Sequence, residues 1–391
     1  MNNKQISAYT AEIIADIEKN GDSAVFKYTG KFDGVDLSKD GCKVPLKDIE
    51  IAAKRVPEAL QKAIKASYSN VLAYHKYEYS QIKKSWKFKR NGITAGQFYT
   101  PVESAGLYVP GGRFPYPSTV IMTAVAAKAA GVKRIVMVTP PKKMSDAVLF
   151  AAKLCGIKEI YRIGGIMAVA ALAYGTKTIK KVDIIAGPGN AYVNEAKRQV
   201  FGKVGIDSLA GPSEVAIIAD KNVPAEYAAA DIMAQAEHDP MAKAYLFCEE
   251  KDKIAKIKAL LSKEALKQVK TELCSLERAV EKSNKIAPEH LELLVKDYAK
   301  LLKSVKNAGA VFAGYQTPTA CGDYWAGPSH VLPTNGSARF SSGLSVMTFL
   351  KKTSYIEMDA KNKKGYKETA EFADSEGMAC HKKSALIRSS R

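Results

Sequence analysis

Apolar residues recur at helical spacing in the first part of the chain. Ile13 and Ile17 lie on one face of a segment from residue 8 to 30, which predicts an amphipathic helix that is interrupted at Gly21. A second pattern of the same kind covers residues 46–80. We therefore expect the N-terminal part of the chain to be helical.

Between residues 104 and 219, short apolar runs alternate with helical patterns. The expected strands are 106–110, 135–138, 159–163, 182–186 and 215–219, and the expected helices are 119–130, 145–154, 166–174 and 191–201. Short apolar strands that alternate with helices indicate a parallel, doubly wound sheet covered on both faces. The predicted fold class is α/β, with Rossmann-like doubly wound domains.

The second half of the chain has a weaker pattern. A helix is expected over residues 225–237, and residues 251–285 are charged and mostly helical. Residues 313–350 are rich in Gly, Pro and Ser, and a long stretch of this kind inside a compact domain is usually functional. Residues 354–391 are expected to form a basic tail.

The composition allows a large folded core. Of the 391 residues, 47% are apolar and 25% are charged, which is ordinary usage for a globular protein of about two or three domains. The six cysteines include no Cys-X-X-Cys pair, which favours reduced thiols over a cysteine zinc site. The N-terminus shows no signal-peptide pattern and no apolar run is long enough to span a bilayer, so we predict a cytoplasmic protein without a membrane partner.

Charge is the unusual feature of the composition. Lys and Arg number 59 against 40 Asp and Glu, a formal net charge of +19, and such an excess suggests polyanionic partners. The basic residues are mostly scattered as pairs, and the densest run, from Lys83 to Arg90, is short and isolated. Because a nucleic-acid footprint needs one continuous basic face, a solvated basic surface is the favoured interpretation and nucleic-acid binding the weaker alternative.

Three glycine-containing turns follow expected strands. They are Gly111-Gly112, Gly164-Gly165 and Gly187-Pro188-Gly189-Asn190. Exposed N–H groups at the start of a helix favour an anion, so each turn is a candidate phosphate site. None of them matches the G-x-G-x-x-G dinucleotide fingerprint, and tight-turn packing explains them equally well.

Four of the five histidines lie in polar segments, each with a carboxylate close in sequence. The pairs are His238 with Glu237, His290 with Glu289, His330 with Asp323, and His381 with Glu376. Gln235 and His238 are three apart on an expected helix, so they share a face and are both suitable zinc ligands. Glu289-His290 is an adjacent acid–base pair, although a glutamate at a helix N-terminus would give the same pattern. Each histidine alone is explained by a structural role, but together they indicate a metal or acid–base site.

Seven segments resemble those of the histidinol dehydrogenases and occur in the order of that family. They are 106–112, 187–190, 210–214, 235–238, 288–291, 322–334 and 376–381. The resemblance implies oxidation of L-histidinol to L-histidine, the last step of histidine biosynthesis, in two hydride transfers to NAD. It further implies a bound histidinaldehyde intermediate, one Zn²⁺ per subunit, and a homodimer with shared active sites.

The resemblance also implies roles for individual side chains. The zinc ligands would be Gln235, His238, Asp323 and His381, with His381 supplied by the partner subunit. Glu289 and His290 would be the catalytic pair. The substrate contacts would be Ser213, His330 and Glu376, together with Gln235, His238, His290, Asp323 and His381. The NAD contacts would be Tyr108, Asn190 and the residue at Met167, where the family usually has a glutamine.

The expected organisation has three parts. They are a larger split α/β domain of residues 8–107 and 214–343, an inserted Rossmann-like domain of residues 108–213, and a C-terminal dimerisation tail of residues 344–391 in a domain-swapped homodimer. The tail is expected to be helical.

Three features depart from the family pattern. The thioether of Met167 cannot make the hydrogen bond that the glutamine amide makes. Relative to the family, the chain begins late, without an N-terminal arm. The segment between His238 and Glu289 is shortened. Three alternatives stay open: a sister dehydrogenase acting on another hydroxylated substrate, a basic nucleic-acid-binding protein on an inactive scaffold, and a metal-storing or structural dimer.

Overall fold

The computed structural model describes residues 2–111 and 115–389, except for the side chains of Asp40, Lys143 and His238. The chain forms two compact units, residues 1–79 with 102–349 and residues 80–101 with 350–391. Among the described helices, none combines the length and the apolar character that a membrane span requires. The three-part organisation expected from the sequence stays a prediction.

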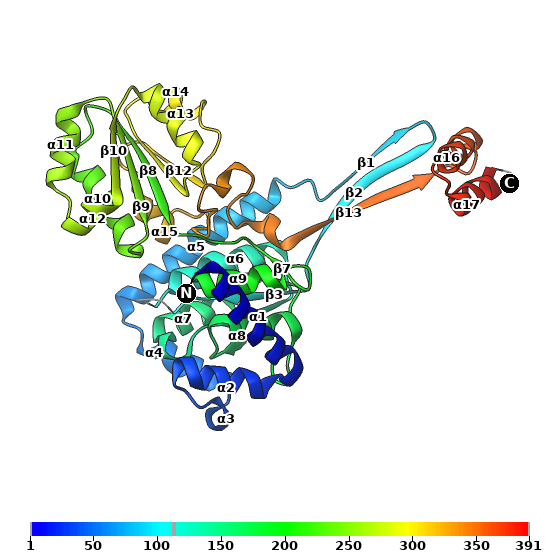
Figure 1. The fold of residues 1–391 in the computed structure, drawn as a ribbon, viewed down its shortest axis with the longest axis horizontal. Coiled ribbons are helices and arrows are strands. Elements are labelled where there is room, and N and C mark those ends of the chain that lie inside the picture. Colours follow the sequence, from blue (N-terminus) through cyan, green and yellow to red (C-terminus); the bar gives the residue numbers. More distant parts are fainter. Residues whose placement is uncertain (1, 112–114, 390–391) are drawn as a thin grey trace. The chain divides into compact units, whose positions relative to one another are not determined.

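The first unit contains two parallel five-stranded sheets (Figure 1). The first sheet consists of β3 (Ser104–Tyr108), β4 (Arg134–Val138), β5 (Glu159–Tyr161), β6 (Ile184–Ala186) and β7 (Gly205–Ile206), in the order β5-β4-β3-β6-β7. The second consists of β8 (Glu214–Ala219), β9 (Lys243–Cys248), β10 (Val269–Leu273), β11 (His290–Leu294) and β12 (Ala310–Ala313), in the order β10-β9-β8-β11-β12. Each order is third-second-first-fourth-fifth along the chain, which is the order of a doubly wound sheet. The α/β class with parallel sheets is confirmed.

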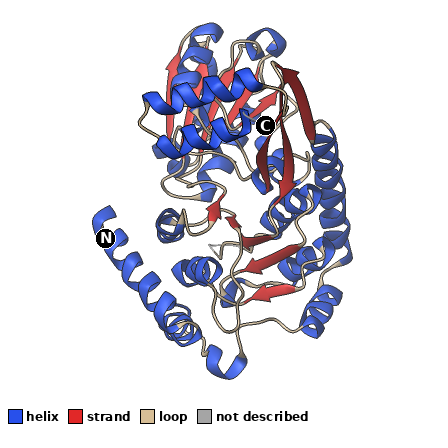
Figure 2. Ribbon diagram, turned by 90° about the vertical axis from the view of Figure 1, so that its right-hand side faces the viewer, coloured by secondary structure: helices blue, strands red, loops and turns tan. Residues whose placement is uncertain are grey.

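Helices cover the first sheet on both faces (Figure 2). One face carries a core built from α1 (Asn3–Asn20), α2 (Asp22–Asp33), α8 (Gly165–Tyr174) and α9 (Ala191–Val200). The other carries α6 (Pro117–Ala130) with α7 (Asp146–Cys155) packed beside it, and α4 (Leu46–Arg55) packs on α7. The predicted break in the first helix is confirmed, since α1 ends and α2 begins at Gly21, whose φ is 56°. The short α3 (Leu37–Asp40) and the long α5 (Glu58–Ser80) complete the N-terminal helices.

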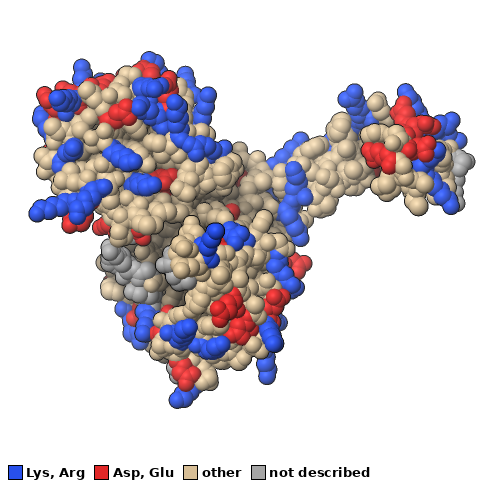
Figure 3. Space-filling model, viewed as in Figure 1, with Lys and Arg blue, Asp and Glu red and all other residues tan. Residues whose placement is uncertain are grey.

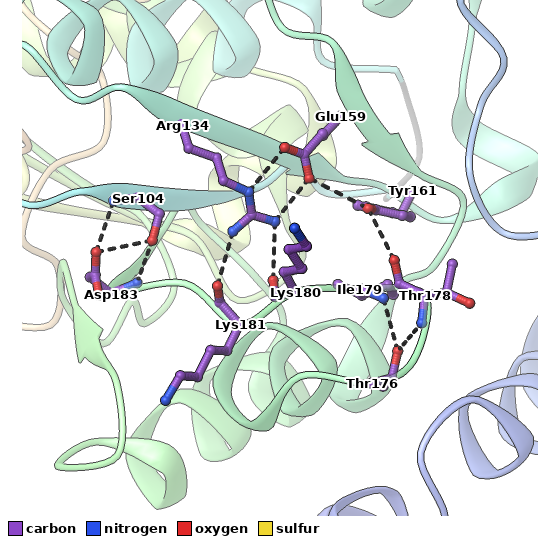
Figure 4. A network of polar contacts seen from close by, with 10 residues as sticks. All are labelled: Ser104, Arg134, Glu159, Tyr161, Thr176, Thr178, Ile179, Lys180, Lys181 and Asp183. Atoms are coloured by element: carbon purple, nitrogen blue, oxygen red, sulfur yellow. Dashed lines mark hydrogen bonds and ion pairs between the residues drawn. The ribbon is translucent and has the colours of Figure 1, made fainter.

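Polar contacts join the amino ends of the strands in the first sheet (Figure 4). Arg134, at the start of β4, donates to both oxygens of Glu159 at 2.9 and 2.8 Å and to the carbonyls of Lys180 and Lys181. Asp183 accepts from the backbone N–H of Ser104 at 2.8 Å. The carboxyl ends of the same strands, where the glycine turns begin, lie at the opposite edge of the sheet.

The second sheet is also buried on both faces. Successive residues of a strand point to opposite faces, and in β8 Val215 and Ile217 pack with α10 (Ala225–His238), α11 (Lys251–Ala259) and α12 (Lys263–Gln268). Ala216 and Ile218 pack instead with α13 (Leu276–Ile286) and α14 (Tyr298–Leu302). The expectation that residues 251–285 are mostly helical is correct except for β10. That strand is charged because it lies at the sheet edge.

The second unit is an antiparallel sheet followed by two helices. Its strands are β1 (Ser85–Arg90), β2 (Ile93–Pro101) and β13 (Leu350–Met358), with β2 in the middle. The helices α16 (Lys363–Ser375) and α17 (Ala379–Ser389) pack against each other. The C-terminal segment expected as a basic tail therefore begins with a strand. The basic run from Lys83 to Arg90 forms most of β1, whose residues are all exposed.

Candidate functional site

Glu289 and His290 lie at the amino end of β11, which pairs with β8 on one side and β12 on the other. His290 is the first residue of this strand, so the alternative of a glutamate at a helix N-terminus is wrong. Both side chains are buried at 6% exposure. The parallel pairing of His290 with Val215 of β8 places Glu289 beside the Ser213-Glu214 start of that neighbouring strand.

Burial governs the electrostatics of Glu289. The pKa of this carboxyl is raised to about 8, mainly because burial removes it from water and in smaller part because of the nearby charges of Asp323 and Glu214. A hydrogen bond from the Ser213 side chain and one from the Glu214 backbone act in the opposite direction. The second carboxyl oxygen of Glu289, Oε2, is buried and has no hydrogen-bond partner among the described residues. This carboxyl is therefore able to gain and release a proton near neutral pH.

Asp323 and His330 come to the same site from α15 (Thr319–Tyr324) and the loop that follows it. The His330 Nδ1 lies 3.2 Å from the carbonyl oxygen of Asp323 and 3.7 Å from its carboxylate Oδ1. Because a carbonyl oxygen only accepts, Nδ1 carries the proton in that hydrogen bond. The other ring nitrogen, Nε2, lies 3.5 Å from the hydroxyl of Thr119 at the start of α6. Burial raises the pKa of Asp323 to about 7.

The ring of Phe312 links α15 to β11. Phe312 of β12 lies 5.7 Å from the ring of His290, measured between ring centroids. On α15, a methyl group at Gly322 would come within 2.6 Å of the Phe312 ring, so only glycine allows this close approach. Asp323 is thereby held near Glu289 and His290.

Gln235 lies on α10, which packs against α15. Its side chain is buried, and its amide nitrogen Nε2 has no hydrogen-bond partner among the described residues. His238 is the last residue of α10, but its side chain lies outside the described residues. Within the described part of the chain, no group of three or more His, Cys, Asp or Glu side chains is arranged to hold a metal ion. Of the four predicted zinc ligands, only Gln235 and Asp323 have side chains that are described in the first unit, because the His238 side chain is not described and His381 belongs to the second unit.

Glu376 and His381 belong to the second unit. Glu376 ends α16, His381 is the third residue of α17, and Gly377 turns the chain between the two helices with a φ of 71°. Both predicted site residues are exposed in the single chain. The two residues are five positions apart in the chain, and both lie on the surface of the second unit.

The predicted cofactor residues lie at the carboxyl edge of the first sheet, where β3 and β6 are neighbours. Such a reversal of strand order is where doubly wound sheets bind ligands. Tyr108 ends β3, and its buried hydroxyl accepts from the backbone N–H of Gly165 at 3.1 Å; burial raises its pKa to about 12. Asn190 caps α9 by accepting from the N–H groups of Tyr192 and Val193, both at 3.1 Å. The starts of α8 and α9 thus both face this edge.

Met167 is a different kind of candidate. Its side chain lies on the first turn of α8 and is buried in the core cluster at 2% exposure. It therefore presents apolar surface and no hydrogen-bond donor. Of the turn Gly111-Gly112, the second glycine lies outside the described residues.

A second pair of carboxyl groups, on β11 and α10, was not predicted from the sequence. Glu292 of β11 is fully buried, interacts with Asp231 of α10, and accepts from the N–H of Thr319 at 3.2 Å. Burial and mutual repulsion raise the pKa of Glu292 well above its usual range. The sequence did contain a sign of Glu292, because this acidic residue interrupts an apolar run. Thr119 and the pair of Lys197 with Asp207 gave no comparable signal.

Comparison with known proteins identifies the family of this chain. Residues 1–389 match the family described as histidinol dehydrogenase. The chain belongs to the histidinol dehydrogenase family. Histidinol dehydrogenase of Thermosynechococcus vestitus is 47% identical over 96% of this chain and 91% of its own length, and that of Lactococcus lactis is 42% identical over 98% and 93%. The crystal structure of histidinol dehydrogenase from Elizabethkingia anophelis superimposes with a TM-score of 0.91 at 34% identity, covering 97% of this chain and 91% of that one.

Membership in the histidinol dehydrogenase family confirms the resemblance on which the site residues were predicted. The chain is an enzyme, an oxidoreductase of histidine biosynthesis that acts on a small molecule. The family also implies the use of NAD. On the face drawn in Figure 3, basic side chains are interspersed with acidic ones.

Proposed function

We propose that this enzyme carries out the zinc-dependent, NAD-linked, four-electron oxidation of L-histidinol to L-histidine through a bound histidinaldehyde. The observation that supports this best is the buried pair Glu289-His290, with Asp323 close enough to raise the pKa of Glu289. A carboxyl that exchanges protons near neutral pH, next to an imidazole, suits a reaction that removes a proton with each hydride.

Zinc fits the chemistry of the residues that are present. The buried amide of Gln235 has an oxygen that can ligate zinc, and the half-buried carboxyl of Asp323 has no Lys or Arg ion partner among the described residues. Amide and carboxylate oxygens with two imidazoles are a donor set that zinc accepts. We propose Gln235, His238, Asp323 and the partner subunit's His381 as ligands. Bound zinc would hold the amino and imidazole nitrogens of the substrate and so orient its carbinol carbon.

The protein residues would then handle the protons. His290 accepts the hydroxyl proton of the substrate while the carbinol hydrogen leaves as hydride. Glu289 takes a proton from the attacking water, and the resulting hydroxide adds to the aldehyde to give the singly ionised hydrate. A second loss of hydride and proton from the hydrate yields the carboxylate. The burial of both residues helps to retain the reactive aldehyde, because a closed site limits its side reactions.

Ser213, His330 and Glu376 are proposed to complete the substrate site. The Ser213 side chain already contacts Glu289, and His330 contacts Asp323, so both border the catalytic pair. Glu376 would offer a carboxylate to the cationic substrate from the same partner subunit as His381.

NAD is proposed to bind at the carboxyl edge of the first sheet and to supply the hydride acceptor. Tyr108, Met167 and Asn190 would contact it, with Met167 contributing an apolar surface where the family usually has an amide. The positive ends of the helices that begin at Gly165 and Ala191 favour the phosphates of a dinucleotide.

A second copy of the chain is the proposed partner of the second unit. Its exposed apolar side chains include Ile356 at 76% and Phe372 at 71% exposure, and exposed apolar surface of this kind marks an interface. Glu376 at the end of α16 and His381 in the first turn of α17 belong to the same unit. We propose a domain-swapped homodimer in which these two residues complete the active site of the other copy.

An assay of NAD reduction tests the proposed function. Histidinol and a set of other hydroxylated compounds would be compared at saturating NAD and zinc, and two NADH per histidinol are expected. One NADH per substrate would contradict the four-electron course. Turnover of a different alcohol without turnover of histidinol would establish the sister-dehydrogenase alternative instead.

A further inference from the structure

A buried ion pair lies directly behind the glycine turn that follows β6. Lys197 on α9 is 1% exposed at its side chain, and Asp207, which follows β7, is 3% exposed. The Lys197 Nζ and the Asp207 Oδ1 are 2.5 Å apart. Neither residue is part of the catalytic site described above.

The two side chains hold both polar backbone groups of Gly187. The N–H of Gly187 donates to the second carboxylate oxygen of Asp207 at 2.7 Å. The carbonyl of Gly187 accepts from the Lys197 ammonium at 3.1 Å. Gly187 has a φ of +122°, which L side chains rarely adopt. The backbone of Gly187 is thus held by hydrogen bonds to two oppositely charged side chains.

Further contacts extend this arrangement along the turn. The amide of Asn194 donates to the carbonyl of Gly189 at 2.8 Å and accepts from the N–H of Ala210 at 3.0 Å. Asn190 then caps α9, from which both Asn194 and Lys197 project. The turn from Gly187 to Asn190 is therefore tied to α9 and to the segment after β7, and it is held in one conformation.

Stability alone does not explain a buried pair of charges. Removing two charges from water is costly, and replacing a buried ion pair by well-packed apolar residues is often neutral or stabilising. What apolar residues cannot do is bind the N–H and the C=O of Gly187 at the same time. The distinctive contribution of the pair is therefore the orientation of the Gly187 peptide groups.

We propose that Lys197 and Asp207 are positioning residues for the dinucleotide. They hold the turn from Gly187 to Asn190 in the conformation that receives the cofactor. This inference rests on the proposed binding of NAD at this edge of the sheet. The pair acts through the turn, and neither side chain is required to touch NAD.

A double apolar substitution separates positioning from stability. Lys197→Met combined with Asp207→Leu removes both charges together, so no unpaired charge remains in the core. We expect the KM for NAD to rise about tenfold or more while the KM for histidinol is unchanged. Equilibrium titration with NAD, followed by NAD-induced fluorescence change, should show the same loss of affinity.

The matched control uses the other charged pair of the same sheet. Arg134→Met with Glu159→Leu removes a pair that also binds backbone carbonyls, but at the amino edge of the strands (Figure 4). Its KM for NAD should stay within about twofold of the original value. An equal rise in both double variants would overturn the positioning role, because it would report a general effect on the sheet.

A replacement variant and two further outcomes complete the test. If the double variant does not fold, Asp207→Asn takes its place, since it keeps the side-chain volume and removes the charge. An unchanged KM for NAD in a folded variant overturns the positioning role while the original enzyme still oxidises histidinol. Absence of NAD reduction by the original enzyme would instead refute the proposed function itself.

Discussion

The backbone of Gly187 lies against the carbonyl oxygen of Tyr108, where the carboxyl ends of β6 and β3 meet. A methyl group at Gly187 would come within 2.2 Å of that oxygen, and the φ of +122° adds strain for any other residue. We expect Gly187→Ala to lower the free energy of unfolding by about 3 kcal/mol or more, because the two strands must separate. Urea denaturation measures this change.

Gly202→Ala is the control for that substitution. Gly202 also has a positive φ, +100°, but a methyl group there would meet nothing within 4 Å. Its loss should be about 1 kcal/mol, the backbone strain alone. Equal losses at the two positions would show that the close contact with Tyr108 is unimportant.

The stability of the metal-free protein should depend on pH through Glu289. Its folded-state pKa is raised to about 8, mainly by burial, so between its ordinary pKa and this value the unfolded chain has released a proton that the folded protein keeps. Stability is therefore highest at low pH and falls by up to ~1.4 kcal/mol per pH unit until the folded pKa is reached. Glu289→Gln should remove this component, which urea denaturation of both proteins from roughly pH 5 to 8 would reveal. Parallel pH profiles would contradict the raised pKa.

His290→Asn should slow turnover by about 10²-fold or more, because a general base is lost. Zinc content should be unchanged, since His290 is not among the proposed ligands. Steady-state assays with histidinol, together with metal analysis, test both statements. Unchanged turnover would mean that another group accepts the hydroxyl proton.

Asp323→Asn should weaken zinc binding about tenfold or more, because an anionic donor is replaced by a neutral one. Competition with a chelator measures the affinity, and activity should fall in parallel at limiting zinc. Asp374→Asn is the control, since Asp374 lies on the exposed side of α16 and pairs with Lys382. Equal metal affinity in the two variants would remove Asp323 from the ligand set.

Mixing two inactive variants tests the shared active site. In a heterodimer of His381→Asn and His290→Asn chains, one site would contain both intact residues and the other neither. Random exchange of subunits should then restore roughly a quarter of the original activity. If each variant is inactive alone and the mixture stays inactive after subunit exchange, His381 acts within its own chain.

The alternation of apolar strands and helices predicted the first sheet better than the second. β3 to β6 are short, apolar and separated by clear glycine turns, so local sequence was sufficient. β10 and β12 lie towards the edges of the second sheet, and β11 carries His290 and Glu292 within its apolar run. A strand whose polar residues serve a site no longer shows the simple apolar pattern from which strands are predicted.

By itself, the sequence determined the α/β class, the break at Gly21, the glycine turns and the neighbouring Glu289-His290 pair, because each depends on residues adjacent along the chain. Only the tertiary structure decided that Ser213, Glu289, Asp323 and His330 meet. Their approach follows from the parallel pairing of β8 with β11 and from the packing of α15 on Phe312. The raised pKa of Glu289 was decided in the same way. Pairing, burial and the loss of water are non-local, so no pattern along the chain specifies them.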